Sequence, residues 1–173
     1  ESFATVGAAD KVLAYSVLRG LFQDATGPAE QRATPFSRLS PDREYTAPDG
    51  SALRLPGRSL VLVRHVGIHM HTDAVLDGYG RAIPAGLLDA LVATAAAVPS
   101  LRGTERSVYV IRPQQHGSEE ADFTIELFRR VESVLGLPER TIKVGVMGEE
   151  RRADVGADRA AAADRIAFID TGF

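Results

Sequence analysis

The chain has 173 residues, of which 45% are hydrophobic and 25% are charged, and its formal net charge is −3 at pH 7. This composition and length are typical of about one globular domain and exclude disordered, collagen-like and coiled-coil chains. The sequence has no cysteine, so disulfides, thiolate metal sites and thiol nucleophiles are excluded as well.

The sequence also indicates which kinds of partner the protein lacks and in which compartment it is located. No stretch approaches the roughly 18 to 20 uninterrupted apolar residues of a membrane-spanning helix, and residues 1–20 lack the basic and then apolar pattern of a signal peptide. There is no block rich in Lys and Arg, and there is no Trp for base stacking. We therefore expect a cytoplasmic protein that binds neither membranes nor nucleic acid.

The first third of the chain predicts a helix and then a short β-rich excursion. Apolar side chains recur at helical spacing over Ala8–Phe22, and Asp10 lies near the positive end of that helix. A turn signal at 48–50 (Pro-Asp-Gly) separates two short strands. These strands are expected at Glu44–Thr46 and Ala52–Leu55.

The rest of the chain alternates between strands of the buried type and helices. The strands are predicted at Ser59–Val66, Ser107–Ile111, Thr141–Met147 and Ile166–Ile169, and the helices at Pro84–Val98, Glu119–Leu135 and Ala157–Arg165. A turn is expected at Asp77–Arg81, and Gly136 is expected to end the second of these helices.

This alternation predicts an α/β fold with a parallel sheet and right-handed crossovers, either doubly wound or part of a (β/α)8 barrel. A complete barrel needs about 250 residues, so four strands amount to half a barrel. We expect a partial (β/α)8 TIM barrel with a small inserted β-rich segment, and an incomplete segment of a longer protein.

Charged and glycine-containing segments follow the ends of the predicted strands. Arg64, the cluster at 148–152 (Gly-Glu-Glu-Arg-Arg) and the segment 171–173 (Thr-Gly-Phe) lie at or just beyond carboxyl ends, which converge on one face of a barrel. A cation, carboxylates and free backbone N–H groups suit a small anionic substrate held on Mg²⁺. The alternative is a solvated ion-pair network within the cluster, and the pattern alone favours it.

Three histidines invite a metal hypothesis. His69 and His71 would point to one side if both lay on a strand, and His65 lies nearby. Because neither a cysteine nor a close carboxylate completes a ligand set, we interpret them as polar residues of the core or its rim.

Several long segments carry a resemblance to a known family. They are LPGRSLVLVRHVG (55–67), TDAVLDGYGRAIPAGLLDALV (72–92), HGSEEADFTIELFRRVESVLGLP (116–138), GEERRADV (148–155) and DRIAFIDTGF (164–173). Together they resemble malate synthases of the G type from end to end. The resemblance implies a (β/α)8 barrel with an inserted β-rich domain. It also implies an acyltransferase of the glyoxylate bypass, linked to the tricarboxylic acid cycle, that condenses acetyl-CoA with glyoxylate and hydrolyses the thioester to malate and CoA.

The same resemblance implies roles for individual residues. Arg64 would be the catalytic arginine, which contacts glyoxylate and stabilises the negative charge that develops on oxygen. Glu149 would ligate Mg²⁺ and contact glyoxylate. Gly172 and Phe173 would hold the glyoxylate carboxylate through their backbone N–H groups. Such close approach favours glycine.

The resemblance also implies contacts to acetyl-CoA, and the comparison with the family pattern shows three positions at which this sequence differs. Ser2 and Arg38 match positions that contact acetyl-CoA, and Arg38 suits its phosphates. The family has aspartate where Gly148 stands, asparagine at His65 and histidine at Ile68. These changes flank the predicted site.

The resemblance divides the chain into three parts: a barrel-associated helix (1–25), part of the inserted β-rich segment (26–57) and the first half of the catalytic barrel (58–173). A second metal carboxylate and the aspartate base lie farther downstream in the family. We therefore expect this segment to need the remainder of the polypeptide, to be inactive alone and to be monomeric when complete.

Two other functions stay open at this point. One is a Mg²⁺-dependent CoA-ester lyase of the citramalyl or citrate lyase β type, which turnover of citramalyl-CoA or malyl-CoA would reveal. The other is a non-catalytic module that binds CoA, against which Mg²⁺-dependent binding of glyoxylate would count.

Overall fold

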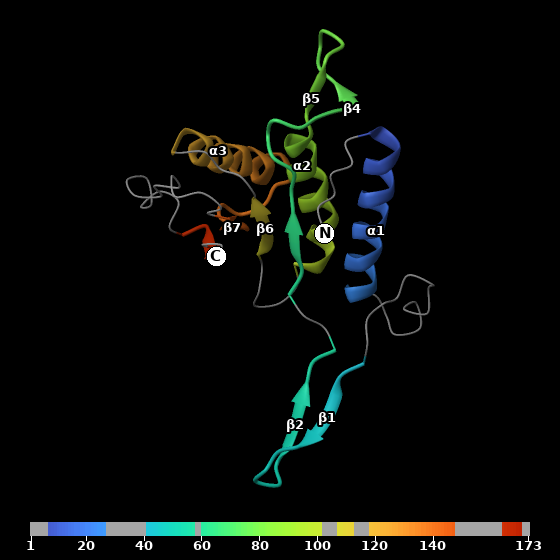
Figure 1. The fold of residues 1–173 in the computed structure, drawn as a ribbon, viewed down its shortest axis with the longest axis vertical. Coiled ribbons are helices and arrows are strands. Elements are labelled where there is room, and N and C mark those ends of the chain that lie inside the picture. Colours follow the sequence, from blue (N-terminus) through green and yellow to red (C-terminus); the bar gives the residue numbers. More distant parts are fainter. Residues whose placement is uncertain are drawn as a thin grey trace.

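A parallel sheet with helices packed against it forms the body of the molecule, and two hairpins extend from that body (Figure 1). The computed structural model describes residues 7–26, 41–57, 60–101, 107–112, 118–147 and 164–170. Its elements are α1 (Ala8–Thr26), β1 (Arg43–Thr46), β2 (Ala52–Leu55), β3 (Leu62–Arg64), β4 (His71–Leu76), β5 (Ala82–Pro84), α2 (Ala85–Ala97), the 3-10 helix η2 (Val98–Ser100), β6 (Val108–Arg112), α3 (Ser118–Val134), β7 (Ile142–Met147) and β8 (Ile166–Asp170).

The main sheet is built in chain order. Its strands pair as β3-β6-β7-β8, and every pair is parallel. A doubly wound sheet reverses its strand order at a switch point, whereas a barrel adds each strand on the same side of the previous one. The observed order is therefore that of a barrel segment, and the predicted partial (β/α)8 barrel is confirmed.

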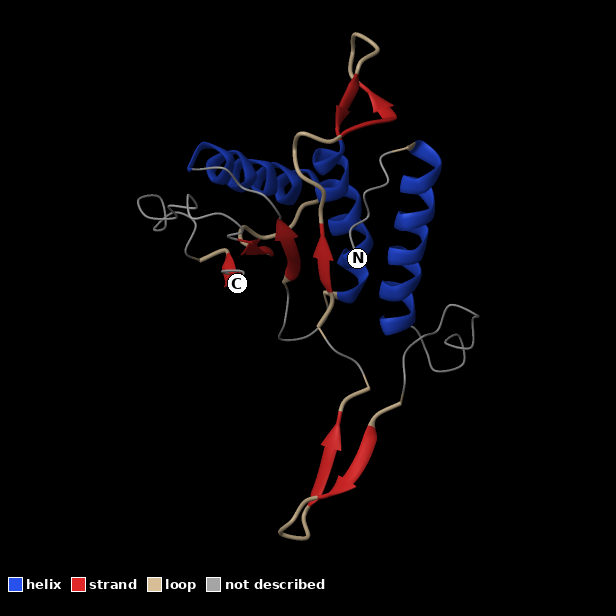
Figure 2. Ribbon diagram, in the orientation of Figure 1, coloured by secondary structure: helices blue, strands red, loops and turns tan. Residues whose placement is uncertain are grey.

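The hydrophobic core lies between the sheet and the two helices α2 and α3, which cover the same face (Figure 2). Alternate residues of β6 and β7 point into this core, as the two-residue period of a strand requires. The buried cluster consists of Ala90, Ala97, Val108, Val110, Phe128, Val131, Ile142, Val144 and Val146. The intervening residues of each strand lie on the opposite face, which is the inner side of a barrel.

The helices follow the sequence predictions closely. α2 begins directly after Pro84, and α3 ends where Gly136 adopts a φ of +64°, a backbone conformation that glycine accepts without strain. The helix predicted at Ala157–Arg165 lies outside the described residues up to position 163, and its last two residues form a turn. Among the described helices, none is long and apolar enough to cross a membrane.

The first predicted core strand is shorter than expected. The apolar run predicts a strand over Ser59–Val66, but β3 comprises only Leu62–Arg64. His65 still donates its backbone N–H to the carbonyl of Ile111 at 3.0 Å. The next N–H, that of Val66, points to a buried side chain of α2 instead of to β6. Ser59 lies outside the described residues, and Leu60 and Val61 precede the strand. The predicted extent was therefore wrong, and at the carboxyl end buried polar side chains replace the sheet partners.

The sequence predicts one of the two hairpins but not the other. β1 and β2 pair antiparallel as predicted and stand apart from the body (Figure 1). β4 and β5 form a second antiparallel pair that the sequence does not predict. The turn expected between them is present, because the carboxylate of Asp77 accepts the backbone N–H groups of Tyr79 and Arg81, both at 2.9 Å.

A buried ion pair joins α3 to the amino ends of β7 and β8. Glu132 and Arg165 are only 1% and 3% exposed, and two hydrogen bonds of 2.7 and 2.8 Å join the guanidinium to the two carboxylate oxygens. Glu132 also accepts the backbone N–H of Ile142 at 2.8 Å. Burial alone would raise the pKa of Glu132, but the hydrogen bonds from Arg165 and Ile142 hold it below its ordinary value. The carboxylate therefore stays ionised and ties three elements together.

Breaking this ion pair should destabilise the fold strongly. Removing one partner of a buried pair leaves an uncompensated charge, so we expect Arg165→Met to lower the free energy of unfolding by about 3 to 5 kcal/mol. Urea denaturation of the natural full-length polypeptide measures this change. The control is Arg130→Met, because Arg130 forms an exposed pair with Glu126 on α3 and such pairs contribute below about 0.5 kcal/mol. Equal losses in the two variants would contradict the prediction.

Candidate functional site

Arg64 lies at the carboxyl end of β3, where the sequence places it. It pairs in register with Ile111 of β6, which in turn pairs with Gly145 of β7. Because paired residues share a face of a sheet, the register places Arg64 on the side away from α2 and α3. The side chain is exposed, and no residue in the described part of the chain forms an ion pair or hydrogen bond with its guanidinium.

An aromatic ring fills part of the same face beyond Arg64. Gly145 pairs with Phe168 of β8, and the phenyl ring lies so close to the glycine that a Cβ at position 145 would overlap it. The inner side of this sheet is therefore partly filled by a side chain, as the interior of a barrel is.

The other predicted site residues lie outside the described residues, so the structure does not bring any two of them together. Glu149 comes two positions after Met147, the last residue of β7, and Gly172 comes two positions after Asp170, the last residue of β8. Since Met147 and Asp170 are register partners, both strands end at the edge that carries Arg64. The remaining predicted residues outside the description are Phe173, Ser2 and Arg38.

The three histidines do not form a metal site in the described part of the molecule. His65 is buried, whereas His69 and His71 are exposed, and only His71 lies on a strand. The described ranges contain no group of three or more His, Asp or Glu side chains that could hold a metal ion. His65 is thus a core residue, and the other two histidines lie at the surface.

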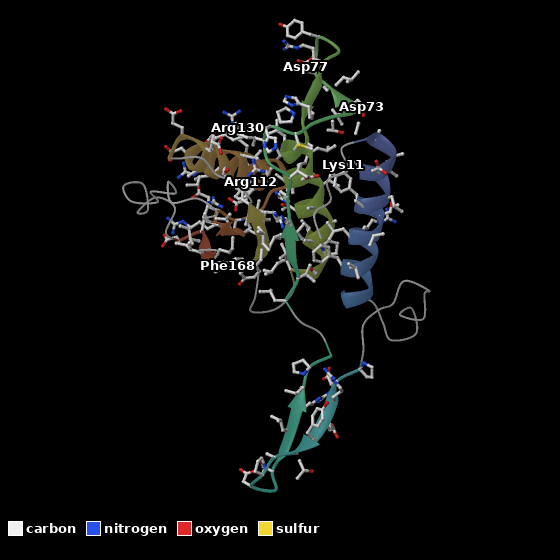
Figure 3. The ribbon with its side chains drawn as sticks, in the orientation of Figure 1. Lys11, Asp73, Asp77, Arg112, Arg130 and Phe168 are labelled. Atoms are coloured by element: carbon white, nitrogen blue, oxygen red, sulfur yellow. The ribbon has the colours of Figure 1, made fainter. Side chains whose placement is uncertain are left out.

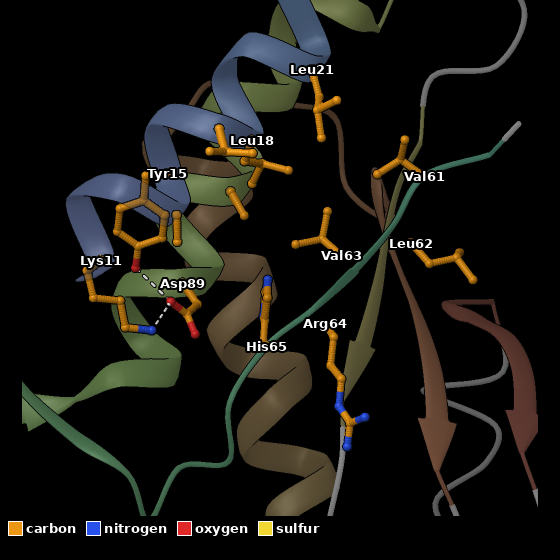
Figure 4. Close-up of a pocket in the computed structure, with 13 residues that line it drawn as sticks. Lys11, Tyr15, Leu18, Leu21, Val61, Leu62, Val63, Arg64, His65 and Asp89 are labelled. Carbon is orange, nitrogen blue, oxygen red and sulfur yellow. Dashed lines mark hydrogen bonds and ion pairs between the residues drawn. The ribbon is translucent and has the colours of Figure 1, made fainter. Parts of the chain in front are cut away.

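A buried polar cluster that the sequence did not reveal lies behind Arg64, on the helix side of β3. The carboxylate of Asp89 on α2 accepts hydrogen bonds from Lys11 Nζ at 2.6 Å and from the Tyr15 hydroxyl at 2.7 Å, both on α1 (Figure 4). Burial first, and then the hydrogen bond to Asp89, raise the pKa of Tyr15 above its ordinary value. Tyr15 therefore stays a neutral donor, and Lys11 supplies the countercharge.

The cluster continues to the end of β6. Arg112 is 2% exposed and donates from Nη1 to the carbonyl of Val66 at 3.4 Å. Burial lowers the pKa of Arg112, and the carboxylates of Asp89 and Glu120 oppose that effect. Figure 3 labels Lys11 on α1 and Arg112 at the end of β6. The only sequence signal for this cluster is an aspartate within the apolar pattern of α2.

The imidazole of His65 is buried without a hydrogen-bond partner among the described residues. Its ring is 1% exposed, and neither ring nitrogen is paired within the described structure. The ring meets Phe128 of α3 edge to face, with centroids 6.4 Å apart. Burial lowers the pKa of His65 to about 3, although Asp89 acts in the opposite direction. The imidazole is therefore neutral at physiological pH.

A cavity of about 190 Å³ separates α1 from β3 and α2. Its walls are mostly apolar side chains of α1 and β3, and Lys11, Tyr15 and Asp89 gather at one end of it (Figure 4). Arg64 belongs to the same strand but extends to the other side of β3 from the Lys11–Asp89 pair, as the close-up shows. Arg64 is nevertheless among the residues that line the cavity, so the cavity adjoins the strand that carries the predicted site.

Fold and site together define a (β/α)8 barrel protein with a cation at the carboxyl edge of its sheet, the face on which such barrels place their active sites. A sequence profile described as "Malate synthase, TIM barrel domain" matches residues 60–173. The chain belongs to the malate synthase family.

Curated relatives extend this similarity to the whole chain. The chain is 42% identical to malate synthase G of Halalkalibacterium halodurans over 185 aligned residues, which cover 100% of the chain and 25% of the relative. It is 41% identical to malate synthase G of Corynebacterium efficiens and 42% identical to that of Corynebacterium glutamicum, again over 100% of the chain. The chain spans about a quarter of the length of these relatives.

His65 should not titrate in the physiological range. The folded protein binds this proton only near pH 3, whereas the unfolded chain binds it near pH 6.5, so stability is lost as the pH falls between these values. We expect the ring C–H resonances of His65 to keep one chemical shift from pH 8 to pH 5. NMR of the full-length polypeptide, with assignment by His65→Asn, measures this. A titration midpoint near 6.5 would show that water or a charge reaches the ring.

Proposed function

We propose that the protein that contains this chain is a malate synthase, which condenses acetyl-CoA with glyoxylate and hydrolyses the thioester to give malate and CoA. The observation that carries this proposal is the position of Arg64, exposed and free of described partners at the carboxyl edge of a barrel sheet. The similarity of the whole chain to about a quarter of each of three malate synthases G supports it. The proposal extends to a role in the glyoxylate bypass and to a cytoplasmic location.

In this proposal, Arg64 is the electrophilic residue. Removing a methyl proton from acetyl-CoA creates an enolate, and attack on the aldehyde moves negative charge onto the glyoxylate oxygen. A guanidinium is always ionised and presents several N–H donors in a fixed plane, so it stabilises oxygen-centred charge without reorganising. The supporting geometry is that the backbone of Arg64 lies at the end of a strand rather than on a loop.

We further propose that Glu149 binds Mg²⁺ and, with it, glyoxylate. The donor chemistry fits, because a carboxylate is a preferred ligand of this hard cation. In the sequence, Glu149 comes two positions after Met147, where β7 ends at the same edge as Arg64. When bound, the ion would act as a Lewis acid and template for the substrate oxygens. Gly148 precedes this residue in place of the aspartate that the family resemblance implies.

The remaining predicted contacts belong to the same proposal. The backbone N–H groups of Gly172 and Phe173 would hold the glyoxylate carboxylate, just beyond the end of β8. Ser2 and Arg38 would contact acetyl-CoA. The division into a barrel-associated helix, a β-rich segment and half of the catalytic barrel stays a prediction of the same kind.

Removing the guanidinium of Arg64 tests the proposal directly. We expect Arg64→Ala to lower kcat for malate formation by about 100- to 1,000-fold in the full-length polypeptide, the loss typical of one transition-state donor. The midpoint of thermal unfolding should change little, because the side chain is exposed. Arg130→Ala on the outer surface of α3 serves as the matched arginine control. Unchanged malate formation, or turnover of citramalyl-CoA instead, would overturn the assignment.

The metal proposal has its own test. We expect chelation with EDTA to abolish malate formation and Mg²⁺ to restore it. Glu149→Gln should weaken binding of Mg²⁺ in a calorimetric titration by at least about tenfold, because a neutral amide is a poorer ligand than a carboxylate. The matched control is Glu126→Gln, which removes an exposed carboxylate on α3. Equal Mg²⁺ affinity in the Glu149 variant and the wild type would remove this residue from the site.

A further inference from the structure

Buried charged side chains hold the peptide groups that follow β3 from two sides. Asp89 Oδ2 accepts the backbone N–H of Val66 at 3.3 Å, and Arg112 Nη1 donates to the carbonyl oxygen of the same residue at 3.4 Å. Val66 lies two positions after Arg64. The two contacts therefore fix the direction of the chain immediately after the proposed catalytic residue.

A glycine makes the second of these contacts possible. A Cβ at Gly86, in the first turn of α2, would lie 2.8 Å from Arg112 Nη1 and 3.0 Å from the carbonyl oxygen of Val66. Contacts that close would force the guanidinium or the carbonyl to move. The absence of a side chain at this position thus lets α2, β6 and the end of β3 meet.

The charges around this contact are matched in number. Asp89 is paired with Lys11 at 2.6 Å, and Arg112 is attracted by both Asp89 and Glu120. Two cations thus face two carboxylates at one edge of the sheet. Well-packed apolar side chains often give equal or greater stability than a buried ionic cluster, so stability alone is a weak reason for these residues. Apolar side chains cannot form hydrogen bonds with peptide groups, so they cannot fix the direction of the backbone in this way.

We propose that Asp89 and Arg112 are positioning residues for Arg64, a role that rests on the proposed function of that arginine. Both lie on the helix side of the sheet and Arg64 lies on the opposite side, so they act through the backbone of His65 and Val66. Rotation of the freed peptide groups would redirect the guanidinium of Arg64. Misplacement of a catalytic group by about 1 Å can lower a rate by about 100-fold.

The first test compares two buried arginines at opposite ends of the sheet. In the full-length polypeptide, we expect Arg112→Met to lower kcat by about 10- to 100-fold while KM for acetyl-CoA changes less than about twofold, because Ser2 and Arg38, the proposed contacts of that substrate, are unchanged. Arg165→Met should lower the unfolding midpoint but leave kcat per folded molecule unchanged. Equal losses of kcat in the two variants would mean that Arg112 only stabilises the fold, and this result would overturn the proposal.

A double-mutant cycle tests whether Arg112 acts through Arg64. If it does, adding Arg112→Met to Arg64→Ala should cause no further loss of kcat, because the group that it positions is already absent. Additive losses would overturn the proposal. If Arg64→Ala alone leaves malate formation intact, the proposed function fails instead, so the two failures are distinguishable.

A milder variant covers the case in which Arg112→Met does not fold. Gly86→Ala keeps every charge and displaces only the Arg112–Val66 contact. We expect it to lower kcat by about tenfold with little change in KM. The matched control is Gly20→Ala on α1, where an added Cβ meets no atom within 4 Å. A wild-type kcat in folded Gly86→Ala would count against the positioning role.

Discussion

The carboxylate of Glu132 is the point from which the sheet is aligned. It is buried, and it binds the guanidinium of Arg165 and the backbone N–H of Ile142 at the same time. Those two residues lie at the amino ends of neighbouring parallel strands. The side chain of Glu132 therefore fixes where both strands begin relative to α3. Parallel strands have no tight turn to set their register, and a long-range contact of this kind supplies it.

The carboxyl edge of the sheet is held by a separate set of contacts. The strands β7 and β8 end together at the register pair Met147 and Asp170, and β3 ends at Arg64 on the same edge. The polar contacts of Asp89 and Arg112 lie there, so ionic clusters hold both edges while the apolar core lies between them. The sheet is thus aligned by charges at its edges and stabilised mainly by apolar burial at its centre.

Apolar periodicity was enough to predict α1, α2, α3 and the order of the core strands, because these elements each bury one continuous face. It also placed Arg64, since a charge at the end of an apolar strand is conspicuous. It did not reveal β4 and β5, where Val75 and Leu76 are exposed and no alternation marks a buried face. Nor did it reveal the partners of Asp89, because Lys11 lies 78 positions away and such contacts leave no local pattern. For the same reason the length of β3 was overestimated.

The contact between Gly145 and Phe168 links two positions that are far apart in the sequence. Their side chains share one volume on the inner face of the sheet, and at present the phenyl ring occupies all of it. A larger residue at 145 is tolerated only if the residue at 168 becomes smaller. The size of the residue at 168 therefore limits the size of the residue at 145, although the two positions belong to different strands.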